Sequence, residues 1–149
     1  MRTRGFTFIE VLIVMVLIGI IAALGIPRIR DAIQKNNVRS ARAAIGTLVA
    51  KARGAAVQRG CKSAIHFTQG SAGKIWVTAC KTTNSALTDT LGGLEQLSAR
   101  YSVTLSTTGD SVQFMPNGVS PDNVLTVIRF TSNGISDSVM INQVGKVVR

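Results

Sequence analysis

The longest apolar stretch of the chain lies near its N-terminus. No residue from Val11 to Ile26 carries a polar side chain, and only Thr7 and Glu10 interrupt the run when it is extended back to Phe6. An α-helix needs about 20 apolar residues to cross the hydrocarbon core of a bilayer. The pattern therefore predicts a membrane-spanning helix over residues 6–27.

After Pro27 the pattern changes from apolar on all sides to apolar on one side. Apolar residues then recur at helical spacing, and at about 100° per residue they share one broad face. We expect Pro27 to kink or soften the helix without ending it, and Gly60 to stop it near residue 59. Residues 28–60 thus form an amphipathic half, whose apolar face is made of Ile33, Val38, Ala41, Ala44, Ile45, Leu48, Ala52 and Ala55.

Residues 61–149 alternate between apolar and polar positions in short stretches, which is typical of β-strands. Turn sequences such as Pro116-Asn117-Gly118 and Ser132-Asn133-Gly134 separate the stretches. The fold class is therefore α+β: a long N-terminal helix whose rear half packs on an antiparallel β-sheet head. Strands are predicted at 63–67, 74–79, 101–105, 111–115, 125–130 and 138–142, with a last strand ending at Gly145-Lys146.

Charge is distributed as unevenly as hydrophobicity. The 149 residues carry a net charge of +10, and residues 28–62 hold nine cations against Asp31 alone. Such basicity next to an apolar span favours anionic partners such as lipid or nucleic acid. Only 5% of residues are aromatic and there is one histidine, so few residues could form a metal site or a platform for bases.

Two ordinary explanations compete for the apolar segment. A secretory signal peptide has a shorter apolar region and a small-residue cleavage site, whereas here Pro27-Arg28-Ile29-Arg30 follows the run. A simple single-span anchor leaves the carboxylate of Glu10 unexplained, because an acid near a membrane span is costly and usually functional. Arg2 and Arg4 lie before the span and Arg28 and Arg30 after it, so the charges do not settle its orientation.

The segment Arg4-Gly5-Phe6-Thr7-Phe8-Ile9-Glu10, followed by the apolar run, closely resembles the N-terminus of type IV prepilins and type II secretion pseudopilins. The resemblance implies a leader peptide over residues 1–5. It further implies that a membrane prepilin peptidase cleaves between Gly5 and Phe6 and methylates the new amine of Phe6. The same resemblance implies a type IV pilin-like fold, with other pilins and an inner-membrane assembly platform as partners.

Glu10 would be the fifth residue of the processed chain. An amine at Phe6 and a carboxylate at Glu10 are each costly in a nonpolar environment, and pairing reduces that cost. The family implies that Glu10 of one subunit meets the Phe6 amine of its neighbour during assembly. The alternative is that Glu10 is satisfied at the positive end of its own helix.

The order of elements in the head, with Phe114-Met115-Pro116-Asn117-Gly118 before one strand and Gly145-Lys146 near the end, resembles GspH/FimT-type minor pseudopilins. This implies a structural subunit of a type IV pilus or a type II secretion pseudopilus. Its helix would cross the inner membrane once, and its head would lie in the periplasm or another extracytoplasmic space. A major pilin is the alternative.

Some members of this family bind DNA through a C-terminal Gly-Arg-x-Arg. Here the tail reads Gly145-Lys146-Val147-Val148-Arg149, with a lysine for the first arginine and one extra residue. A narrow basic stripe also follows the helix beside its apolar face. The alternatives are a DNA or phospholipid contact, in a minor pilin that takes part in DNA uptake, and an ordinary solvated or intersubunit surface. The residues in question are Lys35, Arg39, Arg42, Arg53, Lys146 and Arg149.

Cys61 and Cys80 are the only cysteines and bracket the first predicted hairpin symmetrically. Outside the cytoplasm they could form a disulfide; two buried free thiols are the alternative. His66 has no acid or second histidine near it in the sequence, and we interpret it as a structural or surface residue.

The sequence contains no enzyme signature. It lacks a nucleophile elbow, a P-loop and a dinucleotide fingerprint. Its acids are scattered and do not form the clustered oxygen ligands that calcium requires. We therefore expect no catalytic residue, no cofactor and no metal site.

Overall fold

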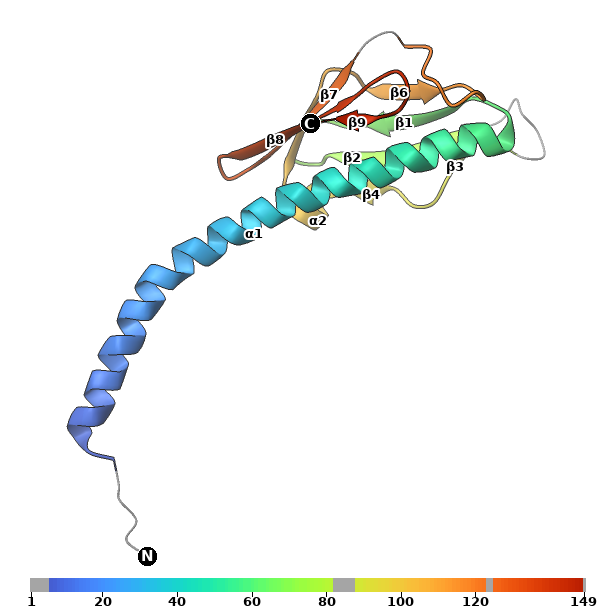
Figure 1. Cartoon of the computed structure of the whole chain (residues 1–149). Helices are drawn as coiled ribbons and strands as arrows, with labels where there is room; N and C mark the ends of the chain where they lie inside the picture. The colour runs from blue at the N-terminus through green and yellow to red at the C-terminus, as the bar shows by residue number, and fades with distance from the viewer. Residues whose placement is uncertain (1–5, 82–87, 123–124, 149) are drawn as a thin grey trace, which may run out of the picture. The chain divides into compact units, whose positions relative to one another are not determined.

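The computed structural model describes residues 6–81, 88–122 and 125–148. The chain divides into two compact units, residues 1–34 and residues 35–149. The helix α1 (Phe8–Arg59) begins in the first unit and ends in the second. Figure 1 shows the elements in chain order, from α1 in blue to β9 in red.

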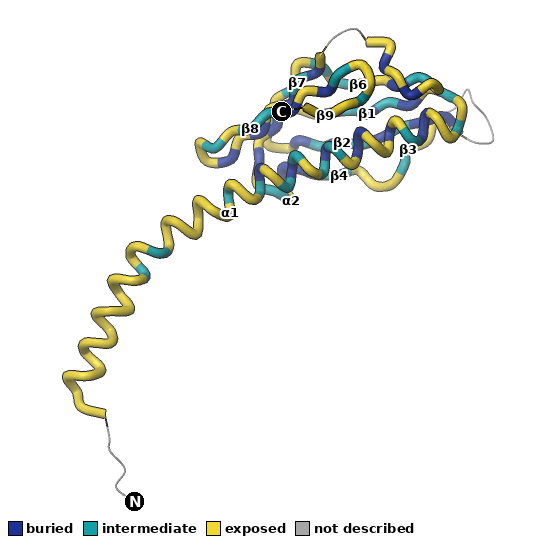
Figure 2. Tube along the Cα trace, in the orientation of Figure 1, coloured by how far each residue is buried: buried dark blue, intermediate teal, exposed yellow. Residues whose placement is uncertain are grey.

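From Val11 to Ile26 α1 is apolar on every side. It runs without a break through Pro27, so this residue does not melt the helix. Side chains from Phe6 to Leu24 are almost all exposed, which Figure 2 shows in yellow. In the described chain, α1 is the one helix long and apolar enough to cross a membrane.

In the second unit, α1 ends where the sequence predicts. Gly60 has a φ of +63°, in the left-handed region that favours glycine at the end of a helix. The amide of Cys61 donates to the carbonyl of Ala56 at 3.3 Å, which satisfies one of the last carbonyls of the helix. Gly60 therefore turns the chain into the first strand.

The head contains two antiparallel sheets rather than the single sheet expected from the sequence. One has the order β3-β2-β1-β6, with β4 also pairing with β2, and the other has the order β5-β7-β8-β9. An isolated bridge between Gly70 and Leu105 connects them. The elements are β1 (Ser63–Phe67), β2 (Lys74–Cys80), β3 (Thr88–Thr90), β4 (Glu95–Gln96), α2 (Leu97–Tyr101), β5 (Thr104–Thr107), β6 (Ser111–Phe114), β7 (Thr126–Ser132), β8 (Ile135–Ile141) and β9 (Val147–Val148).

The core of the head lies between α1 and the inner faces of the sheets. Burial alternates along β1, β2 and β7, as expected of strands with one covered face. The helix contributes one face on which alanines are interspersed with larger apolar side chains. Ile33, predicted for this face, is exposed and belongs to the first unit. The buried helix residues are Val38, Ala41, Ile45, Leu48, Val49, Ala52, Ala55 and Ala56.

Two details of the strand prediction are wrong. Tyr101 ends the short helix α2, and Ser102 then adopts a left-handed conformation with φ +51°, so β5 begins only at Thr104. Gly145 and Lys146 do not end a strand. They form a turn in which Asn142 Oδ1 accepts a hydrogen bond from the Lys146 amide at 2.7 Å, and the chain reverses into β9.

The two glycine motifs of the head meet at the side chain of Arg53. Gly118 and Gly145 have φ values of +76° and +66°. A Cβ on Gly118 would lie 3.1 Å from Arg53 Nε, and one on Gly145 would lie 3.4 Å from Arg53 Cδ and 2.9 Å from Phe114 Cε1. The amide of Ser120 donates to the carbonyl of Gln143 at 2.6 Å, which joins the two loops. The motifs are 27 residues apart in sequence but form one junction.

A second junction ties the end of α1 to the first hairpin. Cys61 and Cys80 are joined by a disulfide. Arg59 Nη1 donates to the carbonyl of Cys80 at 2.5 Å, and Ser63 Oγ donates to the carbonyl of Ala52 at 2.5 Å. Because β1 pairs Ser63 with Ala79, the cysteines are one residue out of register, and Cys61 lies in the bend before β1.

Removing the disulfide should destabilise the head. A crosslink between residues 19 apart restricts the unfolded chain and contributes about 3 kcal/mol. The double variant Cys61→Ser/Cys80→Ala should lower the thermal midpoint, and dithiothreitol should lower the wild-type midpoint to the same value. A wild-type midpoint unaffected by reductant would contradict this expectation.

Gly145→Ala should cost more stability than Gly134→Ala. Both positions have positive φ, but a Cβ at Gly134 meets nothing within 4 Å, whereas at Gly145 it meets the ring of Phe114. The shared backbone strain is about 1–2 kcal/mol, and overpacking at Gly145 adds about 1–3 kcal/mol. Chemical denaturation measures the difference, and equal losses would show that the Phe114 contact is easily relaxed.

Candidate functional site

The segment that carries the predicted processing site lies at the start of α1. Gly5 falls outside the described residues, and Phe6 is 83% exposed. Thr7 caps the helix, because its hydroxyl accepts a hydrogen bond from the Glu10 amide at 3.3 Å and its carbonyl accepts from the same amide at 3.1 Å. Thr7-Phe8-Ile9-Glu10 thus has the sequence of a capping box, with its threonine half formed.

The carboxylate of Glu10 has no hydrogen bond or ion pair within the described residues. It lies in the first turn of α1 and is exposed. The backbone of Glu10 is therefore satisfied by its own helix, while its charged group points to solvent. This arrangement leaves the carboxylate available to a group outside the chain, such as the amine of a neighbouring subunit.

The four basic residues predicted on α1 do form a stripe, since they fall within about 60° around the helix axis. Lys35 and Arg39 are exposed. Arg42 is different: its Nη1 lies 3.0 Å from Asp137 Oδ2 on β8, and the two side chains are 33% and 13% exposed. Asp137 Oδ1 also accepts the Ser138 amide at 3.0 Å. Asp137 thus neutralises one cation of the stripe.

Of the remaining predicted cations, Arg53 and Lys146 lie near the Gly145 turn. The stem of Arg53 packs beside Gly118 and Gly145, and the side chain of Lys146 is exposed. Arg149 lies outside the described residues. The structure therefore brings Arg53 close to the turn that carries Lys146. The aliphatic part of the Arg53 side chain packs against the glycines of this region.

Sequence reasoning missed the contact that Asp137 makes with Arg42, because 95 residues separate them and nothing local links them. It also missed the surroundings of His66. The His66 ring stacks on Trp76 with centroids 5.2 Å apart and an interplanar angle of 17°, and His66 Nε2 lies 2.9 Å from Thr78 Oγ1. The sequence did contain a signal for this contact, because the alternation of the predicted hairpin places His66 and Trp76 on the same face.

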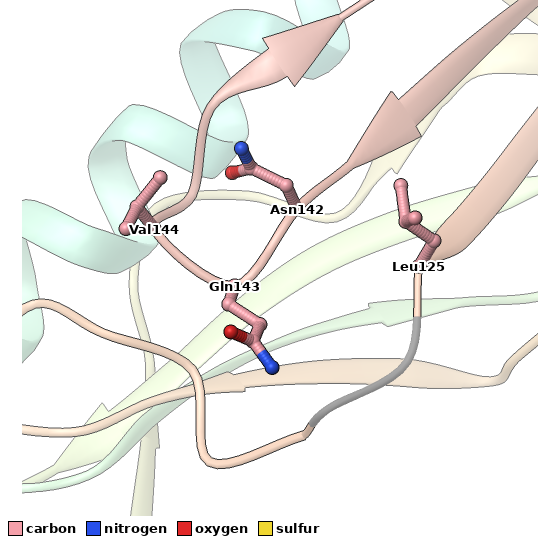
Figure 3. Close-up of a pocket in the computed structure, with 4 residues that line it drawn as sticks. All are labelled: Leu125, Asn142, Gln143 and Val144. Atoms are coloured by element: carbon pink, nitrogen blue, oxygen red, sulfur yellow. The ribbon is translucent and has the colours of Figure 1, made fainter.

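One hollow of the head lies at the turn after β8. It has a volume of about 320 Å³ and is lined by Leu125, Asn142, Gln143 and Val144, and Figure 3 shows Leu125 across from the turn that carries the other three. These lining residues include no ionisable side chain. Within the described residues no group of three or more His, Cys, Asp or Glu side chains could hold a metal ion.

Comparisons with known proteins find one sequence motif and one similar fold. Residues 1–26 match the prokaryotic N-terminal methylation motif. The type IV minor pilin FimU of Pseudomonas aeruginosa has a similar structure in two crystal forms, with TM-scores of 0.60 and 0.56. Sequence identity is 16% and 15%; the matches cover 76% and 74% of this chain, and 88% and 90% of FimU. No curated protein sequence matches the chain.

At this identity the likeness to FimU establishes the fold, and the motif at residues 1–26 is an independent observation on the sequence. A pilin fold with a methylation motif indicates a structural subunit rather than an enzyme. Residues 1–26 thus carry the N-terminal methylation motif, and the chain has the fold of the type IV minor pilin FimU.

Proposed function

We propose that the chain is a minor pilin or pseudopilin, made as a precursor and assembled into a type IV pilus or a type II secretion pseudopilus. The observation that carries the proposal is the methylation motif on a chain with the fold of a minor pilin. Prepilin peptidase would cleave between Gly5 and Phe6 and methylate Phe6. The inner membrane would hold α1 before assembly, with the head on the extracytoplasmic side.

Several structural features support a role as a subunit. The first unit exposes apolar side chains on all sides of α1, which suits a helix that exchanges lipid for the helices of other subunits. The Glu10 carboxylate is unpartnered within the described residues, as an intersubunit contact requires. The Arg53 junction of Phe114, Gly118 and Gly145 gives the GspH/FimT-like head motifs a shared packing role and supports a minor subunit of that type.

Capture of duplex DNA by the basic stripe has less support. Asp137 neutralises Arg42, and the stem of Arg53 is committed to packing. Lys35, Arg39 and Arg53 are exposed on α1, and Lys146 is exposed in its turn. We therefore favour assembly over DNA uptake as the function of this surface.

Processing should require a small residue at position 5. Gly5→Leu should leave the full-length precursor in the membrane because the larger side chain does not fit beside the scissile bond. Gly5→Ala is the matched control and should be cleaved. Mass spectrometry of the membrane fraction measures the N-terminus. Cleavage of Gly5→Leu at the wild-type rate would overturn this assignment of the leader.

Assembly should require the negative charge of Glu10. Glu10→Gln keeps the length of the side chain and the Thr7 cap but removes the partner of the neighbouring amine, so it should insert, be cleaved and enter filaments at least about tenfold less well. The measurement is the amount of the variant in sheared filaments, divided by the amount that remains in the membrane. Glu10→Asp, which keeps the charge, should be less impaired. Wild-type incorporation of Glu10→Gln would exclude the charge pairing.

A further inference from the structure

The outer face of the hairpin β1–β2 carries the single tryptophan and the single histidine of the chain. The register pairs His66 with Trp76 across the two strands, and it pairs Ala64 with Thr78. Ile65 and Val77 alternate with these residues and are buried in the core. His66 and Trp76 therefore stand on the side of the sheet away from α1, and both are partly exposed.

The two rings form a stacked pair that the strands hold in place. Their planes are 17° from parallel, and the contact between His66 Nε2 and Thr78 Oγ1 fixes the imidazole. Partial burial lowers the pKa of His66 by desolvation, so the ring is neutral at physiological pH. The pair is a pre-ordered aromatic surface rather than two independent side chains.

A depression of about 280 Å³ lies beside this pair. Ala64 occupies its centre, because in the sheet its methyl lies between the longer side chains of Thr78 and Gln113. His66 and Lys62 also line it. The hollow can therefore take a flat ring next to the imidazole, with hydroxyl, amide and ammonium groups at its rim.

Cations flank the aromatic pair along the hairpin. Lys62 precedes β1, and Lys74 begins β2 on the same face as Trp76 at the opposite end of the hairpin. At about 3.3 Å per residue the two lysines are roughly 20 Å apart. Within the described strands, no outward-facing position of β1, β2 or β6 carries a carboxylate. Those positions are Ala64, His66, Lys74, Trp76, Thr78, Ser111 and Gln113.

From this arrangement we infer that the outer face of β1–β2 binds single-stranded nucleic acid. Unpaired bases stack at Trp76 and in the hollow over Ala64, while Lys62 and Lys74 contact phosphates at the two ends. Proteins that bind single strands without sequence preference combine these elements, an aromatic platform and cations along the backbone path. This site is independent of the assembly role and of the basic stripe on α1.

The surface favours a single strand over a duplex. A stacking platform requires the flat face of a base, and in a duplex the neighbouring base pairs cover that face. A duplex is instead recognised by its regularly spaced phosphates, which two lysines on a small hairpin match poorly. Asp122 Oδ2 accepts the Gln113 amide at 3.5 Å, so one carboxylate lies near the hollow, and the preference for a single strand rests on the stacked rings and the two lysines.

Because Trp76 is the only tryptophan, its fluorescence reports directly on this site. The full chain in nonionic detergent micelles should show saturable quenching with a 12-nucleotide oligodeoxythymidylate at about 150 mM salt. For Trp76→Leu, binding is measured by the anisotropy of a labelled strand. The affinity should fall by about tenfold or more, as expected for the loss of one stacking contact. Lys62→Gln should weaken binding and make it less dependent on salt.

Two further variants keep the test decisive. Ala64→Glu places a carboxylate in the hollow, retains Trp76 as the probe, and should abolish quenching even if Trp76→Leu folds poorly. Arg39→Gln on the stripe is the matched control and should leave the single-strand affinity within about twofold. The inference is overturned if a duplex of equal length binds as tightly and responds only to Arg39→Gln. It is equally overturned if polygalacturonate, and not the oligonucleotide, quenches Trp76.

Discussion

The head depends on the close packing of one narrow face of α1 against two small sheets. Ala41, Ala52 and Ala56 are fully buried on that face, and Ile45 and Val49 fill the space between them. The inner side chains of β1, β2 and β7 pack against these helix residues in the same core. Larger residues at the alanine positions would separate the layers, since interiors of this density tolerate added volume poorly.

This packing has to coexist with a different demand on the same helix. From Val11 to Ile26 α1 is apolar on all sides, as is typical of a helix in lipid or in a bundle of other helices. In the second unit it is amphipathic, with a buried apolar face and a basic stripe. One continuous helix therefore has two kinds of surface, and the pattern changes near Pro27. The proposed assembly role makes use of this division of the helix.

The head is closed by contacts between segments far apart in the chain. The disulfide and the Arg59–Cys80 hydrogen bond tie the end of α1 to β2, and the Arg53 junction ties the middle of the helix to two loops. The ion pair from Arg42 to Asp137 adds a contact with β8. The ion pair engages Arg42, whereas Lys35, Arg39 and Arg53 remain exposed. The outer face of β1–β2, away from α1, takes no part in these contacts and carries the stacked rings of His66 and Trp76.

The sequence by itself determined the parts of this protein that depend on local pattern. Residues 6–10 and the apolar run indicate processing and membrane insertion, the 3.6-residue period predicts α1 to residue 59, and alternation predicts most strands, because each signal is contained in a few neighbouring residues. Only the tertiary structure decided what distant segments do together. It divided the strands into two sheets, turned the chain at Gly145, paired Arg42 with Asp137 and stacked His66 on Trp76. Register and packing set these contacts, and no single stretch of sequence encodes either of them.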